Sequence, residues 1–180
     1  SGDNDTNGIS IYNDSLALNS GTIRDASGNY ATITHSEFPD NSSYIVDNTA
    51  PTVISVVPTS STSNSAISQY KIPANGSLCD ANCYIYITAT WSEDVVHAGH
   101  QTINIDIDGT IRTAEWYRTA GYLQFRYSIR EDDPLDTDGI SIPANAISLN
   151  NSTITDLAGN VASITHRLVE DNPLYQVKDW

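Results

Sequence analysis

Tyr84-Ile-Tyr-Ile-Thr-Ala-Thr-Trp91 is the stretch that decides the fold of this chain, because its residues alternate strictly in character. Ile85, Ile87 and Ala89 fall on one side of an extended backbone, and tyrosines and threonines fall on the other. A hydrophobic period of two is typical of a β-strand with one buried face. The sequence therefore predicts a strand here whose isoleucines enter a core.

The same pattern continues along the chain. Thr102-Ile-Asn-Ile-Asp-Ile107 alternates, and Asp108-Gly109 then predicts a tight hairpin turn into a return strand over 110–117. Helical spacing is nearly absent. Short strands at such intervals predict an all-β fold, an antiparallel sandwich. The remaining expected strands cover 52–57, 66–72, 122–129 and 161–167, with shorter segments near 140–142 and 147–155.

One block of sequence occurs twice. Asp5-Thr-Asn-Gly-Ile-Ser-Ile11 returns as Asp136-Thr-Asp-Gly-Ile-Ser-Ile142, and 17 of the 31 positions from Asp5 to His35 are identical at a constant offset of 131. A constant offset over this length indicates a tandem repeat. We expect residues 1–48 to be the C-terminal part of one repeat, 49–168 to be a complete repeat, and 169–180 to be a linker or the start of the next unit.

Charge narrows the range of partners. The chain has 22 acidic and 8 basic residues and a net charge of −14. Phosphate binding needs clustered Lys and Arg, so nucleic acid and anionic membrane surfaces are excluded as expected partners. No apolar run is long enough for a membrane span. Surplus carboxylate favours either solubility by self-repulsion or the binding of calcium, which prefers oxygen ligands.

The repeated block resembles the bacterial Ig-like repeats of large surface adhesins. The resemblance is carried by Asp136–Ile142, Leu149–Ile154 and Asp156–Asn160, with Val46–Thr52 similar to the inter-repeat linker of that family and Trp91–Val95 similar to its Ser-Glu turn. It covers nearly all of the chain and departs from the family at Cys79 to Cys83 and at 169–173. It implies a Greek-key Ig-like sandwich strung in tandem on a secreted or cell-surface protein, often with calcium at the joints.

Acidic and amide side chains gather where a cation would sit between loops. Asp47 and Asn48 lie at the expected joint, and Glu93 and Asp94 lie in a loop that could reach it. Since Asp and Asn are also common turn formers, an ordinary turn role stays open for each of these residues. The candidate calcium ligands are Asp47, Asn48, Glu93, Asp94, Asp132, Asp133, Asp136, Asp138, Asp156 and Asn160.

The two cysteines, Cys79 and Cys83, are too few for a metal site and do not have the spacing of a redox pair. We expect a small disulfide-closed loop, which fits an extracytoplasmic compartment.

No Gly-x-Ser-x-Gly nucleophile motif is present. Pairs of acidic residues, as a glycosidase would need, occur in any chain this acidic and are weak evidence for catalysis, so we expect no enzyme. Aromatic residues raise an alternative, because Trp116, Tyr117 and Tyr122 could border a sugar-binding patch. The expected function is a calcium-rigidified spacer or adhesion element that contacts neighbouring repeats and, at most, a host-cell, matrix or glycan ligand. The alternative is a carbohydrate-binding module, alone or attached to a secreted hydrolase.

Overall fold

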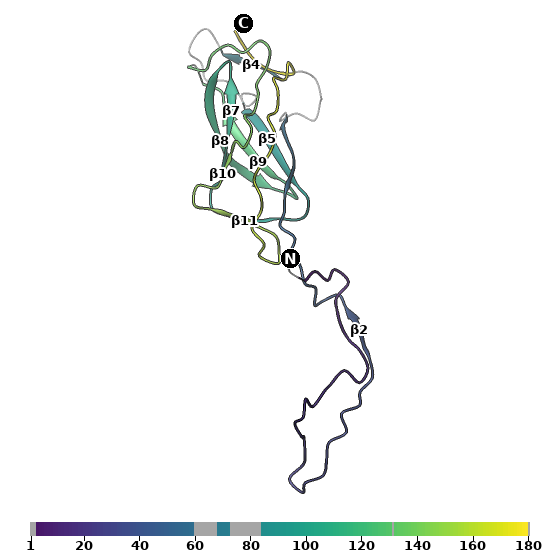
Figure 1. Ribbon diagram of the computed structural model, residues 1–180. Helices are drawn as coiled ribbons and strands as arrows, with labels where there is room; N and C mark the ends of the chain where they lie inside the picture. The colour runs from purple at the N-terminus through teal and green to yellow at the C-terminus, as the bar shows by residue number, and fades with distance from the viewer. Residues whose placement is uncertain (1–2, 60–67, 73–83, 131, 180) are drawn as a thin grey trace. The chain divides into compact units, whose positions relative to one another are not determined.

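The computed structural model describes residues 3–59, 68–72, 84–130 and 132–179 (Figure 1). The chain divides into two compact units, Ser1–Thr49 and Ala50–Trp180. The described residues form strands, bridges and turns, and no helix occurs among them. The all-β prediction is confirmed. Cys79 and Cys83, and with them the predicted disulfide, lie outside the described residues.

A curled sheet of six antiparallel strands forms the main body of the second unit (Figure 1). Five of the strands correspond to segments that the sequence predicts as strands, and the Asp108-Gly109 turn joins two of them with positive φ at both residues, as a type I′ hairpin requires. In spatial order the strands are β10 (Ile147–Ser148), β7 (Thr102–Ile107), β8 (Thr110–Thr119), β9 (Leu123–Ser128), β5 (Tyr84–Trp91) and β3 (Val53–Thr59).

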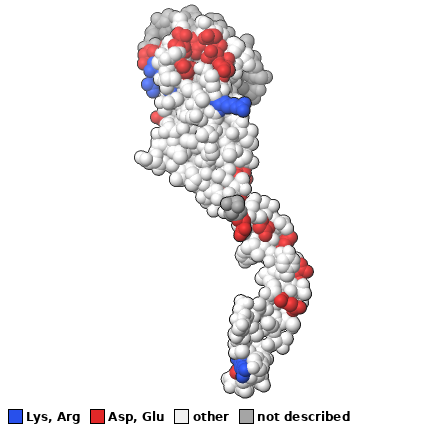
Figure 2. Space-filling view, viewed as in Figure 1, with Lys and Arg blue, Asp and Glu red and all other residues white. Residues whose placement is uncertain are grey.

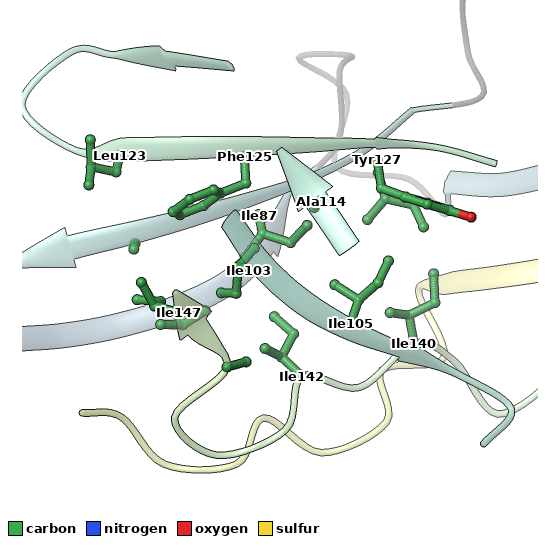
Figure 3. Packing of buried hydrophobic residues seen from close by; sticks show 14 of the residues in the cluster. Ile87, Ile103, Ile105, Ala114, Leu123, Phe125, Tyr127, Ile140, Ile142 and Ile147 are labelled. Carbon is green, nitrogen blue, oxygen red and sulfur yellow. The ribbon is translucent and has the colours of Figure 1, made fainter. Parts of the chain in front are cut away.

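One face of this sheet carries the core. Ile85, Ile87 and Ala89 of β5 are fully buried, as their alternation predicts. The close-up in Figure 3 shows Ile103 and Ile105 of β7 on the same side of the core as Ile142 and Ile147, with Leu123, Phe125 and Tyr127 of β9 on the opposite side. Ile147 pairs with Ile103 and Ser141 with Asp106, so residues 141–148 extend the sheet beside β7. The curl of the sheet brings this part opposite β9, an arrangement consistent with a β-sandwich.

Two smaller strand pairs complete the second unit. β11 (Thr153–Thr155) pairs antiparallel with β6 (Val96–Ala98), and β12 (Tyr175–Asp179) pairs in parallel with β4 (Ser68–Ile72). The predicted strand over 161–167 forms only isolated bridges. Residues 169–180, predicted to be a linker or a new unit, belong instead to the second unit, because Val169 pairs with Ile142 and the fully buried Val177 pairs with Asp136.

The first unit contains β1 (Ile9–Ile11) and β2 (Phe38–Asn41), which pair with each other. It has almost no buried residue. Its apolar side chains are largely exposed to solvent, including Phe38 and Tyr44. A unit of this kind has strands but no core of its own.

Backbone hydrogen bonds of the first unit recur in the second unit at residues 131 further along the chain. Asp5 N–H donates to Val46 O at 2.7 Å, and Asp136 N–H donates to Val177 O at 2.8 Å. Further donor–acceptor pairs recur in the same way, among them Ile9 to Tyr44 and Ile140 to Tyr175, Asp14 to His35 and Asn145 to His166, Asp25 to Asn29 and Asp156 to Asn160, Ala31 to Ile23 and Ala162 to Ile154. The correspondence extends past His166 to Val177.

Candidate functional site

The repeated Asp-x-x-Gly turn is built in the same way in both units. Gly139 N–H donates to Asp136 Oδ1 at 2.6 Å, and Gly8 N–H donates to Asp5 Oδ1 at 2.8 Å. Gly139 has φ 111°, and a Cβ on it would come within 2.0 Å of Asn172 O, so the turn needs glycine for both conformation and space. The aspartate therefore has a structural role as the acceptor that closes this turn.

Asp136 is a buried carboxylate in an acidic neighbourhood. Burial raises its pKa above the usual value, and the nearby charges of Asp138 and Asp171 act in the same direction. The backbone N–H groups of Gly139 and of Asp108, the latter 3.3 Å from Asp136 Oδ2, lower the pKa but do not overcome the burial. Figure 2 shows acidic side chains gathered at one end of the second unit.

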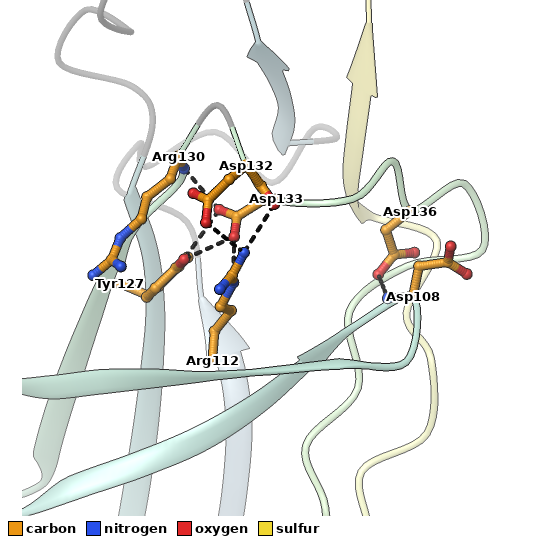
Figure 4. Close-up of polar contacts among 7 residues, drawn as sticks. All are labelled: Asp108, Arg112, Tyr127, Arg130, Asp132, Asp133 and Asp136. Carbon is orange, nitrogen blue, oxygen red and sulfur yellow. Dashed lines mark hydrogen bonds and ion pairs between the residues drawn. The ribbon is translucent and has the colours of Figure 1, made fainter.

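Asp133 also lies near this end of the unit, and hydrogen-bond donors contact its carboxylate (Figure 4). Its side chain is wholly buried and accepts hydrogen bonds from Arg112 Nε at 2.6 Å, Tyr127 Oη at 2.8 Å and Arg130 N at 2.7 Å. The hydrogen bond to Asp133 raises the pKa of the Arg112 guanidinium, and burial followed by the same carboxylate raises that of Tyr127. The neighbouring Asp132 also contacts Arg112, at 3.1 Å, but its side chain is 70% exposed.

This arrangement separates residues that the sequence groups as one acidic run. Asp132 and Asp133 face a guanidinium, whereas Asp136 faces two backbone amides. Asp138 is exposed beside Asp136. Calcium binding by these residues stays a prediction, and the buried Asp133 would have to give up Arg112 to take part in it.

The second candidate ligand group lies in the loops of the second unit near β11. Asp156 is buried, and its carboxylate accepts Asn160 N at 2.8 Å and Asn160 Nδ2 at 2.7 Å. Burial alone would raise the pKa of Asp156, but these hydrogen bonds lower it below its usual value. A Glu93 carboxylate oxygen lies within 4.8 Å of one from Asp156. Two carboxylates at this separation repel each other and suit a shared cation.

The first unit contains the equivalent of the Asp156 turn and the residues of the predicted joint. Asp25 accepts Asn29 N and Nδ2, both at 2.9 Å, and these bonds lower its pKa. Asp47 Oδ1 accepts Thr49 N–H at 2.9 Å, and Asn48 Nδ2 donates to Asp3 O. Asp94, the remaining predicted ligand, is exposed in the second unit.

The aromatic residues predicted to form one patch divide between two environments. Trp116 is half-buried against the core, with His97 at 4.9 Å between ring centroids. Tyr117 lies on the opposite, exposed face of β8, where its ring centroid is 5.5 Å from that of Tyr86. Tyr122 joins Tyr117 only through Arg118, whose guanidinium lies about 6 Å from each ring centroid.

Sequence reasoning missed most of this surface, which we call the tyrosine–arginine face. Arg126 lies 4.6 Å from the ring centroids of both Tyr84 and Tyr117, and Glu115 is its cross-strand neighbour. The alternation of β5 already places two tyrosines on one side, but only the strand register reveals which residues face them. The face comprises Tyr84, Tyr86, Tyr117, Arg118, Tyr122 and Arg126.

No protein-family model matches this chain, and no curated protein or solved structure matches it either. Within the described residues, no helix has the length and apolarity that crossing a membrane requires.

Proposed function

We propose that the chain is a spacer segment of a bacterial extracellular adhesin-type protein, made of one Ig-like repeat and the C-terminal part of another. The observation that carries this proposal is the recurrence of the same hydrogen bonds at residues 131 apart. Repeats of this kind stack their units into an extended array, and their role is to hold a distal region away from a surface.

Calcium is the proposed stiffening agent at the joint. Glu93 and Asp156 supply carboxylates within 4.8 Å of each other. Asp47 is the last carboxylate before Pro51 in the sequence, four residues upstream of it. Pro51 is attached to the second unit, because its carbonyl accepts Ser163 N–H at 2.8 Å. A cation held by both sides of the joint would remove hinge freedom between neighbouring repeats.

Thermal unfolding with calcium and then with excess chelator tests this proposal. A ligand that binds only the folded state at about 100 times its Kd stabilises that state by about 2.7 kcal/mol, so the melting temperature should rise. Glu93→Gln should abolish most of the rise, while the matched control Glu115→Gln, on the outer face of the sheet, should keep it. No rise in the unchanged protein, or a full rise in Glu93→Gln, would contradict calcium at this site.

A second candidate function is supported by the tyrosine–arginine face. Among the described residues, neither Arg118 nor Arg126 forms an ion pair. Arg118 donates to Gln124 Oε1 at 2.8 Å and to Tyr122 Oη at 3.1 Å, so Arg126, stacked on Tyr84 and Tyr117, is the proposed donor to an acidic sugar. The carbohydrate-binding alternative therefore rests on Tyr117 and its arginines. Trp116 has less weight in it, because that ring packs against the core.

Binding to an array of neutral and uronic-acid glycans distinguishes the two candidates. The carbohydrate-binding candidate predicts a signal that Tyr117→Ala removes and that Tyr44→Ala, an exposed tyrosine of the first unit, leaves unchanged. Absence of any glycan signal would leave the spacer as the sole candidate function.

A further inference from the structure

Equivalent apolar residues of the two units differ sharply in burial. Four isoleucines of the second unit lie in the core, whereas their counterparts 131 residues earlier are about half exposed. The exposed and buried partners are Ile9 at 48% and Ile140 at 0%, Ile11 at 50% and Ile142 at 0%, Leu16 at 50% and Ile147 at 5%, and Ile23 at 48% and Ile154 at 1%.

In the second unit, strand β7 lies beside residues 141–148 and pairs with them. Asp106 N–H donates to Ser141 O at 2.9 Å, and Asn104 N–H donates to Ala146 O at 3.1 Å. Ile147 pairs with Ile103 in the sheet, so the isoleucines of β7 enter the core beside Ile142 and Ile147 (Figure 3). Both backbone pairing and side-chain packing therefore come from residues that precede the repeated block.

In the first unit the same place is an open apolar groove of about 540 Å³. Among the described residues, β1 pairs with β2 and with no other strand. The groove is lined by Ile11, Ser15, Leu16, His35, Ser36 and Phe38, and three of their counterparts in the second unit, Ile142, Ala146 and Ile147, lie in the core.

We propose that this apolar face of the first unit is a docking surface for a β-sheet. The sheet would be formed by a segment equivalent to residues 50–131 that directly precedes Ser1 in the parent chain. The inference rests on the proposed repeat organisation. The docked sheet would pair its counterpart of β7 with Ser10 and Ser15, the equivalents of Ser141 and Ala146. It would then bury the four exposed apolar side chains as the second unit buries theirs.

A second copy of this chain is a poorer occupant. The edge of its β7 is already paired with its own residues 141–148, and its own Ile140, Ile142 and Ile147 already lie in its core. Docking onto the first unit would require these residues to leave and to be exchanged for side chains of nearly the same kind. Such an exchange gains little contact area over the intact unit, so the separate sheet is favoured.

Hydrogen exchange measured by mass spectrometry on an extended chain tests the proposal. The extension is a second copy of residues 50–131 placed before Ser1, which preserves the offset because Asp132 is the equivalent of Ser1. Peptides covering residues 9–23 should exchange at least about tenfold more slowly than in the original chain and should approach the rate of residues 140–154 in the same molecule. All measurements are made in excess chelator, so that the result does not depend on the calcium joint.

A matched control carries Ile103→Asp and Ile105→Asp in the added copy only, and in it residues 9–23 should exchange as fast as in the original chain. Equal exchange in the extended and original chains would overturn the proposal, and so would protection that survives in the aspartate control. A dimeric original chain whose residues 9–23 are already protected would assign the face to a second copy instead. If the thermal-unfolding experiment shows no calcium response while residues 9–23 are protected in the extended chain, the calcium joint is refuted and the docking surface stands.

Discussion

Ile142 and Ile11 offer a comparison of one residue type at equivalent positions with opposite burial. Ile142 is fully buried in the core of the second unit, while Ile11 in the first unit is half exposed. Truncation to alanine removes three carbons in each case. At about 0.8 kcal/mol for each buried methylene, Ile142→Ala loses about 2.4 kcal/mol of transfer free energy before any cavity is counted. The cavity brings the expected cost to about 3 to 4 kcal/mol.

Ile11→Ala should leave the stability of the second unit unchanged, since Ile11 belongs to the other unit. Chemical denaturation followed by tryptophan fluorescence measures this difference, because Trp91 and Trp116 both report on the second unit. We expect Ile142→Ala to lower the denaturation midpoint at unchanged slope and Ile11→Ala to leave it within about 0.5 kcal/mol of the original. A cost below about 1 kcal/mol for Ile142→Ala, or equal costs for both variants, would refute the assignment of the core.

Three further predictions concern the polar end of the second unit and its turns. Asp133→Ala should destabilise the unit by about 3 kcal/mol in urea unfolding, because it leaves buried donors without an acceptor. Asp132→Ala, which truncates an exposed side chain, should cost at most about 1 kcal/mol, and equal costs would contradict the pairing of Asp133 with Arg112. Since burial raises the pKa of Asp136, the folded state binds that proton more tightly than the unfolded state, and this contribution to stability is lost as pH rises above about 4. The unfolding free energy of the original protein minus that of Asp136→Asn should therefore fall as the pH rises above about 4, and a rise would contradict the sign. Gly139→Ala should lower the melting temperature more than Gly159→Ala, because both have positive φ but only Gly139 has a backbone oxygen, at 2.0 Å, in the way of a Cβ; the reverse order would refute the steric argument.

The sequence was sufficient to predict the strands whose residues alternate. β5 and β7 each have one face of small or branched apolar residues, and burial on that face follows directly from the period of two. The Asp108-Gly109 hairpin was predictable for a similar reason, because few residue pairs adopt positive φ twice in succession.

The C-terminal boundary was not found, because identity between the two copies thins out after His166. Asp40, Asn41, Tyr44 and Val46 do match residues 131 further on, ending at Val177, but they are scattered over seven positions. Short strands such as β12 gain their pairing from a distant partner and have no strong local pattern. Extending the fixed offset past His166 would have placed the last strand in the second unit.

The candidate sites were less predictable than the fold, because their chemistry depends on register. Arg112 and Asp133 are 21 residues apart, and only the curl of β8 and β9 brings them together. This pairing leaves no signal in the local sequence. The division of Trp116 from Tyr117, in contrast, was available from the sequence, because consecutive residues of a strand point to opposite faces.

Backbone NMR chemical shifts of Asp5–Ile11 and Asp136–Ile142 in one sample test the central claim most directly, that the two copies adopt one structure in different surroundings. The account predicts matching secondary shifts at each pair of equivalent residues, with Gly8 and Gly139 both reporting the positive φ of their turns. Random-coil shifts for Asp5–Ile11 beside ordered shifts for Asp136–Ile142 would contradict it.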